Sequence, residues 1–234
     1  MLQKFVKTGF LSYFVFLSFL LANSTCYGNA DRFQFWPSAG ISWEINKDWT
    51  MNYREELRLN DGGGTLYYGH SDIGVVYKSL AEWLDVGVNY TVIYGTHNNA
   101  RSTDENRTSL STIIRGKILN HDFSDRIRIE YRDRDQKSDI WRFRNKFTLD
   151  RKFELLDPRG NRETSKWKIK PYFSDEIYDN LDGTSFSAND FRIGNVIKLT
   201  ENISLDLYYS FQTVKEDEKW SNRNVIGMDF TYYF

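Results

Sequence analysis

The chain of 234 residues contains 17 Phe, 15 Tyr and 7 Trp, but only 3 Pro and 1 Cys. The many aromatic residues exclude a disordered chain, the low Pro and Cys counts exclude a collagen or a disulfide scaffold, and the low mean hydropathy excludes a bundle of membrane helices. With 31 basic and 32 acidic residues the charge is balanced, so nothing suggests a nucleic-acid partner.

Residues 1–30 have the features of a secretory signal peptide. Two lysines near the start precede a continuous apolar stretch at 9–21, which is too short to span a bilayer but has the length of a signal-peptide core. Gly28 and Ala30 fit the small-residue rule for cleavage. The sequence therefore predicts an exported protein that is cleaved after Ala30.

The predicted mature chain, 31–234, contains no cysteine. An alternative is a lipoprotein acylated on Cys26, but the polar residues before Cys26 are a poor match for lipidation. If cleavage follows Ala30, disulfides, cysteine catalysis and thiolate metal sites are all excluded.

The mature chain is predicted to be all-β, because apolar and polar residues alternate in segments of about 10 to 14 residues that are separated by polar turns. No segment has a convincing helical period. In chain order, the predicted strands are 33–45, 49–59, 66–78, 83–95, 106–119, 123–134, 138–151, 166–178, 188–199, 203–214 and 222–234.

Short and long connections alternate between these strands, as in transmembrane barrels with tight periplasmic turns and longer outer loops. A soluble β-sandwich would also alternate, but its strands would be about half as long. Aromatic residues beside the short turns would form an interfacial girdle. The long connections are predicted at 61–65, 96–105, 134–138, 179–190 and 215–221.

The predicted fold is an antiparallel transmembrane β-barrel of ten to twelve strands. Twelve is favoured over the eleven counted, since single-chain bacterial barrels normally have an even number. The uncounted strand would lie in 96–105 or 154–165, unless 33–45, which Pro37 interrupts, crosses differently. Glu55 and Asp175 have the parity of the lipid face, so we expect either a bulge that re-aims them or pairing with a neighbour.

The last strand places Phe230, Tyr232 and Phe234 at alternate positions and ends the chain on Phe234. This ending resembles the signal by which the barrel-assembly machinery recognises Gram-negative outer-membrane proteins. The chain further resembles a family of outer-membrane β-barrels of unknown function, in the segments FW at 35–36, EELR at 55–58, LYYGHSDIGVVY at 66–77, RIEYRDR at 128–134, WRFRNKFTL at 141–149, KPYFSDEIY at 170–178 and LDLYYSFQT at 205–213.

The resemblance implies a barrel in the outer membrane of a Gram-negative bacterium, in contact with outer-membrane lipid and lipopolysaccharide. It carries over no catalytic residue and no ligand. The sequence itself predicts no cofactor and no metal site, because the three His are isolated from one another.

The polar faces of the strands are rich in basic residues, which must point into the lumen because a lipid-facing Arg or Lys at the midplane costs about 2 to 4 kcal/mol. The hypothesis is a narrow channel for small anionic solutes. Its predicted selectivity surface is Arg54, Arg58, Arg115, Arg126, Arg128, Arg132, Arg134, Arg142, Arg144 and Lys146, with Glu56, Glu130, Glu176 and Asp206 as acidic partners.

Two alternatives stay open at this stage. Long arginines paired with these acids could fill the interior as a closed, salt-bridged barrel with a structural or assembly role. Less favoured is an outer-membrane hydrolase using His70, which shares an inward face with Tyr68 and Asp72 but has no nucleophile at a recognisable spacing. The sequence therefore favours a protein without enzymatic activity.

Overall fold

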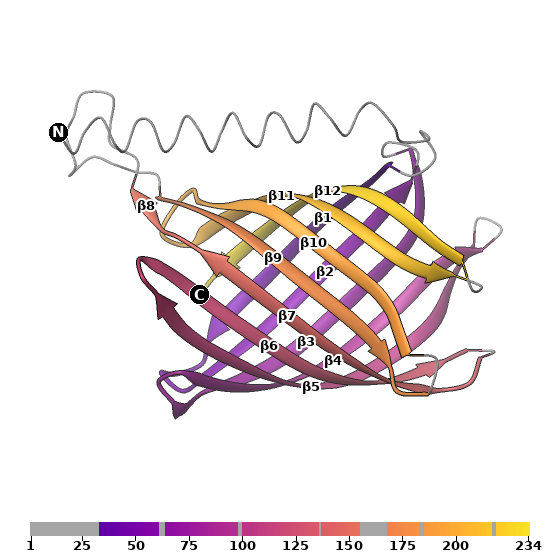
Figure 1. Ribbon diagram of the computed structural model, residues 1–234, viewed down its shortest axis with the longest axis horizontal. Helices are drawn as coiled ribbons and strands as arrows, with labels where there is room; N and C mark the ends of the chain where they lie inside the picture. Colours follow the sequence, from indigo (N-terminus) through magenta and orange to yellow (C-terminus); the bar gives the residue numbers. More distant parts are fainter. Residues whose placement is uncertain are drawn as a thin grey trace.

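The computed structural model describes residues 33–60, 64–97, 100–135, 137–154, 168–182, 185–216 and 219–234, and the predicted signal peptide lies outside these ranges. The described residues form strands that wrap into one tilted, closed sheet (Figure 1). Within them no helix is long and apolar enough to cross a membrane. The strands are β1 (Phe33–Glu44), β2 (Trp49–Asn60), β3 (Thr65–Ala81), β4 (Leu84–His97), β5 (Ala100–Ile118), β6 (His121–Arg134), β7 (Ile140–Asp150), β8 (Phe153–Glu154), β9 (Lys168–Asn180), β10 (Ser185–Lys198), β11 (Ile203–Glu216) and β12 (Lys219–Tyr233).

The two-residue strand β8 continues β7 and is not a separate strand of the barrel wall. It pairs with β9 in the same register in which β7 pairs with β9. The break lies opposite Pro171, whose carbonyl accepts the N–H of Arg151 at 3.2 Å but which has no N–H to donate in return. Eleven strands therefore make the described wall, within the predicted range of ten to twelve and equal to the number counted in the sequence.

The barrel closes through a parallel pair. Strand β1 runs beside β12 in the same direction, from Phe33 opposite Asn224 to Ser42 opposite Tyr233, and every other neighbouring pair is antiparallel. An odd number of strands joined by hairpins requires this arrangement, because the first and last strands then point the same way. The expectation of an even count does not hold for the described wall.

Pro37 does not interrupt the first strand. Strand β1 runs through it, while its ladder with β2 skips from Phe35 to Ser38. Parallel pairing with β12 continues across Pro37, which lies opposite Met228. A proline is tolerated here because a single missing N–H interrupts the hydrogen bonds to only one neighbour.

The outer face is apolar in the middle and aromatic at both ends. The end with short turns carries the exposed side chains of Trp43, Trp49, Trp83 and Phe234, and the Trp49 ring is 4.9 Å from that of Tyr77. At the other end the outer face carries the ring pairs Tyr131–Trp141 and Phe186–Trp220. Such paired girdles are typical of barrels that cross a bilayer. The central belt between them includes the exposed side chains Ile41, Ile73, Val88, Leu110, Ile129, Leu207, Ile226 and Phe230.

Glu55 and Asp175 remain on the outer face and are paired rather than re-aimed by a bulge. The hydroxyls of Tyr53 and Ser71 both donate to Glu55, the former at 3.1 Å. Asp175 accepts from the amide of Asn189 at 2.7 Å. Local hydrogen bonds thus satisfy both carboxylates on the apolar surface. Of the two alternatives expected from the sequence, a bulge or pairing with a neighbour, the structure shows pairing.

Inside the barrel, tyrosine rings lie flat over glycines of the next strand. A Cβ at Gly194 would come within 2.6 Å of the Tyr172 ring, and one at Gly227 would collide with the ring of Tyr208. The glycines are therefore required by close approach, not by turns. This packing fixes where the tyrosine hydroxyls point in the lumen.

Candidate functional site: the polar lumen

A buried network of arginines and glutamates fills the side of the lumen formed by β5, β6, β7 and β9. The alternation of each strand points every second side chain inward, and the register then places Glu130 directly opposite Arg142, and Arg128 directly opposite Arg144. We call this set the arginine network. Its members are Glu105, Arg107, Arg126, Arg128, Glu130, Arg132, Arg142, Arg144 and Glu176.

Glu130 is the centre of the arginine network. Arg142 donates to it from Nε and Nη2 at 2.9 and 2.5 Å, and Arg144 donates from Nη1 at 2.7 Å. Arg128 lies farther away, at 3.6 Å. Only 2% of Glu130 is exposed, so these cations supply the charge compensation that water would otherwise give.

Two further glutamates extend the arginine network on either side of Glu130. Glu176 Oε1 accepts from Arg126 at 3.0 Å and from Arg144 at 2.7 Å, so Arg144 bridges two glutamates. Glu105 accepts a two-pronged contact from Arg132, at 2.5 and 2.7 Å, and a further one from Arg107. Bidentate pairing of this kind fixes geometry as well as charge.

An aromatic cluster covers the wall formed by β1, β2 and β3. The guanidinium of Arg58 lies between the rings of Trp36, at 3.7 Å, and Tyr68, at 4.4 Å, and donates to Glu56 at 2.8 Å. Trp36 is fully buried and donates its indole N–H to Gln34. Stacking on the two rings and hydrogen bonding to the carboxylate of Glu56 hold this arginine against the wall.

The remaining wall, formed by β10, β11 and β12, carries separate ion pairs. Arg192 donates to Asp190 at 2.6 and 3.0 Å, and Asp190 is fully buried. Arg54 donates to Asp229 at 2.5 Å across the seam between β1 and β12, and Ser38 donates to the same carboxylate. The first pair lies within β10, whereas Arg54 and Ser38 connect β2 and β1 to β12 across the seam on the inside.

The burial of these inward side chains shows that the lumen is packed at this level. Side chains that line an open, water-filled pore would be exposed to water. Instead Trp36 and Asp190 are 0% exposed, and Glu176 and Tyr208 are buried as well. These buried residues come from several strands around the ring, β1, β9, β10 and β11.

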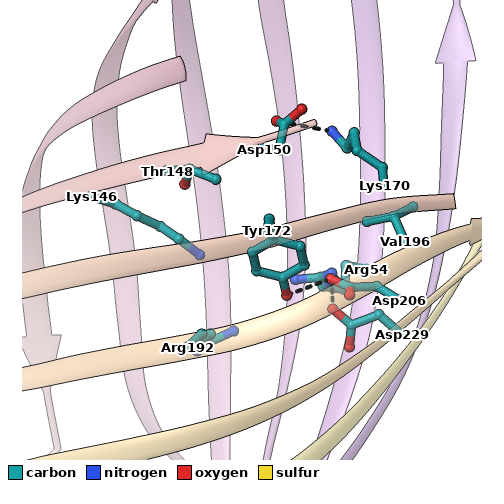
Figure 2. A pocket seen from close by; sticks show the side chains of 10 residues that line it. All are labelled: Arg54, Lys146, Thr148, Asp150, Lys170, Tyr172, Arg192, Val196, Asp206 and Asp229. Carbon is teal, nitrogen blue, oxygen red and sulfur yellow. Dashed lines mark hydrogen bonds and ion pairs between the residues drawn. The ribbon is translucent and has the colours of Figure 1, made fainter. Parts of the chain in front are cut away.

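Toward the end with short turns the packing opens into a cavity of about 210 Å³ (Figure 2). Strand β7 supplies three of its lining residues, and the opposite wall supplies the Arg54–Asp229 pair. Tyr172 donates to Asp206 at 3.0 Å across its floor. The lining consists of Arg54, Lys146, Thr148, Asp150, Lys170, Tyr172, Arg192, Val196, Asp206 and Asp229.

The structure distributes the sequence-predicted lumen residues among different surroundings. Arg126, Arg128, Arg132, Arg142 and Arg144 belong to the arginine network together with Glu130 and Glu176, while Arg58 and Glu56 pair on the opposite wall. Arg54 and Lys146 line the cavity.

Three predicted residues stand apart from the arginine network. Arg115 pairs with Asp85 nearer the short turns. Arg134 donates to the carbonyl of Ser138 and so closes the β6–β7 connection. Asp206, expected as a partner for arginine, accepts from Tyr172 instead, and no ion pair joins it to another described residue.

Sequence reasoning missed two carboxylates of the lumen, Glu105 and Asp190. Glu105 falls in the loop before the predicted strand 106–119, whereas β5 begins at Ala100. Asp190 falls in the overlap of the predicted connection 179–190 and the predicted strand 188–199, whereas β10 begins at Ser185. The available signal was parity, since Glu105 alternates with Arg107 and Asp190 with Arg192. Extending the alternation by a few residues would have placed them inside.

The surroundings of His70 offer no catalytic arrangement among the described residues. Its ring lies edge-on to Tyr68, 5.7 Å between centres, and its Nδ1 is 3.8 Å from Glu56. Neither neighbour is a nucleophile for acyl transfer. Within the same part of the chain, no group of three or more His, Cys, Asp or Glu side chains could hold a metal ion.

Comparison with known proteins places this barrel in a family. The family described as "Protein of unknown function (DUF2490)" matches residues 33–223. No curated protein matches the chain. Among solved structures, LpxR from Salmonella typhimurium is similar with a TM-score of 0.53 and 11% sequence identity, over 83% of this chain and 87% of that chain. At that identity the likeness shows a shared barrel fold alone.

Proposed function

We propose that this chain, which belongs to the family of proteins of unknown function DUF2490, is an integral outer-membrane protein. Its barrel is closed to ion flow. The observation that carries the proposal is the burial of Trp36, Glu130 and Asp190 in the middle of the lumen. A lumen filled by paired arginines and glutamates acts as a rigid, salt-bridged core rather than as a pore.

The outer face supports the membrane location. Its apolar belt would contact the acyl chains, and the two aromatic girdles would lie at the interfaces. Outer-membrane lipid and lipopolysaccharide are therefore the proposed surroundings. The last strand presents Phe230, Tyr232 and Phe234 on its outer face, where the barrel-assembly machinery would recognise them.

A second candidate is a narrow channel for small anions, and the charge of the lumen favours it. Around Glu130 and Glu176 there are five inward bases, Arg126, Arg128, Arg142, Arg144 and Lys146, so the two acids leave an excess of positive charge. Such an excess attracts anions to any water that enters the lumen.

The double variant Arg128→Glu, Arg144→Glu distinguishes the two candidates. In a closed barrel it breaks the arginine network and lowers the denaturant concentration at which the refolded barrel unfolds, without creating selective permeation of reconstituted vesicles. In a channel it reverses the preference for anions over cations. Lys198→Glu, on the same inner parity but exposed near a short turn, is the matched control and is expected to change neither property.

Membrane location is tested separately by fractionating cells that express the full chain. The proposal predicts that the protein co-fractionates with outer membranes and migrates differently on gels with and without heating, as folded barrels do. Recovery in the soluble fraction would overturn the proposed location.

A further inference from the structure

One of the lysines that line the cavity near the short turns forms no ion pair with any described residue. Each of the other three cations that line it has a carboxylate of its own: Arg54 pairs with Asp229 at 2.5 Å, Lys170 with Asp150 at 3.4 Å, and Arg192 with Asp190 at 2.6 Å. Lys146 makes no hydrogen bond or ion pair with any residue in the described part of the chain. In Figure 2 its amino group points into the space beside Tyr172 and Arg192.

The carboxylate that faces Lys146 in the register is already occupied. Glu176 lies directly opposite Lys146 on β9, but its Oε1 accepts from Arg126 and Arg144, and its Oε2 accepts from Tyr178 at 3.2 Å. Two arginines thus displace the lysine from its nearest acid. Lys146 is left at the border between the arginine network and the cavity.

The neighbours of Lys146 increase its need for negative charge. Arg126 stands directly opposite it on β6, and Arg192 repels it from the other side of the cavity. A cation that is removed from bulk water and surrounded by other cations is costly unless an anion compensates it. Asp150, Asp190 and Asp229 are each paired with another cation. Asp206 accepts from Tyr172 and forms no ion pair with Lys146. Lys146 therefore remains available to an anion from outside the chain.

From this geometry we infer that the cavity is a binding site for a small oxyanion, held chiefly by Lys146. The compact charge of its ammonium group suits a phosphate or a carboxylate group. Arg192 supplies a second positive charge, and the hydroxyl of Thr148, two residues along the same strand face, is positioned to donate a neutral hydrogen bond.

Size and charge limit what this site accepts. The volume of about 210 Å³ holds a phosphate or a small organic acid but excludes a large ligand. Three aspartates also line the cavity, so a polyanion that filled it would meet carboxylates as well as cations. A single compact anionic group therefore fits best, either as a free solute or as the headgroup of a lipid.

The experiment is calorimetric titration of the refolded mature protein, in uncharged detergent, with inorganic phosphate and with acetate. The variant Lys146→Gln removes the charge at nearly constant length, and Lys198→Gln is the matched control because it removes an inward lysine that lies outside the cavity lining. Binding is expected at one site per chain, weakened at least tenfold by Lys146→Gln and unchanged by Lys198→Gln. Both variants should show the heat-dependent gel migration of a folded barrel.

The same preparations identify the source of the anion. If free phosphate does not bind because a headgroup occupies the site, solvent extraction followed by mass spectrometry should recover a phosphorylated lipid from the wild type and much less from Lys146→Gln; this outcome also supports the site. Binding that Lys146→Gln leaves unchanged, or neither binding nor co-purified lipid, overturns it. The inference does not depend on whether the barrel conducts ions, so its failure and the failure of the closed-barrel proposal are separate results.

Discussion

Arg142 and Glu130 form a buried two-pronged ion pair across the β6–β7 ladder, in which Nε and Nη2 of the arginine both donate to Oε2 of the glutamate. The two residues are directly opposite in register, so the backbone places them together before any side-chain adjustment. Strand alternation points both side chains into the middle of the lumen, and their pairing contributes to the packing there.

Replacing Glu130 by Gln should strongly destabilise the barrel. The substitution removes the negative charge that Arg142 and Arg144 share, leaving Arg142 buried without a carboxylate and Arg144 with Glu176 alone, which is expected to cost about 3 to 5 kcal/mol. Urea titration followed by tryptophan fluorescence measures the change. The exposed pair Lys168–Glu154 provides the control, since Glu154→Gln should cost less than about 1 kcal/mol. Equal effects of the two substitutions would contradict the assigned role of Glu130.

Gly227→Ala should impair folding because the added methyl group would collide with the ring of Tyr208. The expected loss is about 1 to 3 kcal/mol of unfolding free energy, as for other overpacked interiors. Tyr208→Ala removes the obstacle, so the double variant should be more stable than the sum of the two single losses. Strict additivity in this double-mutant cycle would show that the ring and the glycine do not depend on each other.

An arginine on the lipid face should be tolerated at the edge of the barrel but not at its middle. Leu110 points outward from the middle of β5 and is 54% exposed, so Leu110→Arg is expected to cost about 2 to 4 kcal/mol in a bilayer. Leu80→Arg, at the end of β3 beside a short turn, should cost at most about 1 kcal/mol. Folding yields into lipid vesicles compare the two. A soluble protein would tolerate both substitutions alike.

Leu119→Gly should stabilise the protein despite removing a large side chain. Leu119 lies in the turn between β5 and β6 with φ of 55°, and its side chain is exposed. Glycine adopts positive φ without the steric cost that a leucine bears, so unfolding should become harder by about 1 kcal/mol. Leu181→Gly, at another exposed turn position without positive φ, should instead be neutral or destabilising. The same urea titration tests both variants. A loss of stability in Leu119→Gly would contradict the backbone strain inferred at Leu119.

Strand positions and faces could be predicted from the sequence because both depend on local alternation. Phe230, Tyr232 and Phe234 lie on the outer face of the last strand, and the arginines of β6 and β7 lie inside, where parity put them. The same rule missed Glu105, because polar residues hid the true start of β5, and it missed Asp190, which falls in the predicted connection 179–190 as well as in the predicted strand 188–199.

Closure and partner choice could not be predicted, because neither is local. The parallel pairing of Phe33 with Asn224 joins residues at opposite ends of the chain, and no turn chemistry signals it. Likewise, the sequence shows that Lys146 and Glu176 face inward, but not that Arg126 and Arg144 would take the glutamate and leave the lysine unpaired. Only the register across three strands determines that outcome.

The closed lumen is tested most directly by planar-bilayer conductance of the refolded mature protein, with a salt gradient so that the reversal potential reports ion selectivity. The packing around Trp36, Glu130 and Asp190 predicts a folded barrel that inserts without reproducible current steps. Reproducible, anion-selective steps would contradict the closed barrel and establish the basic lumen as a pore.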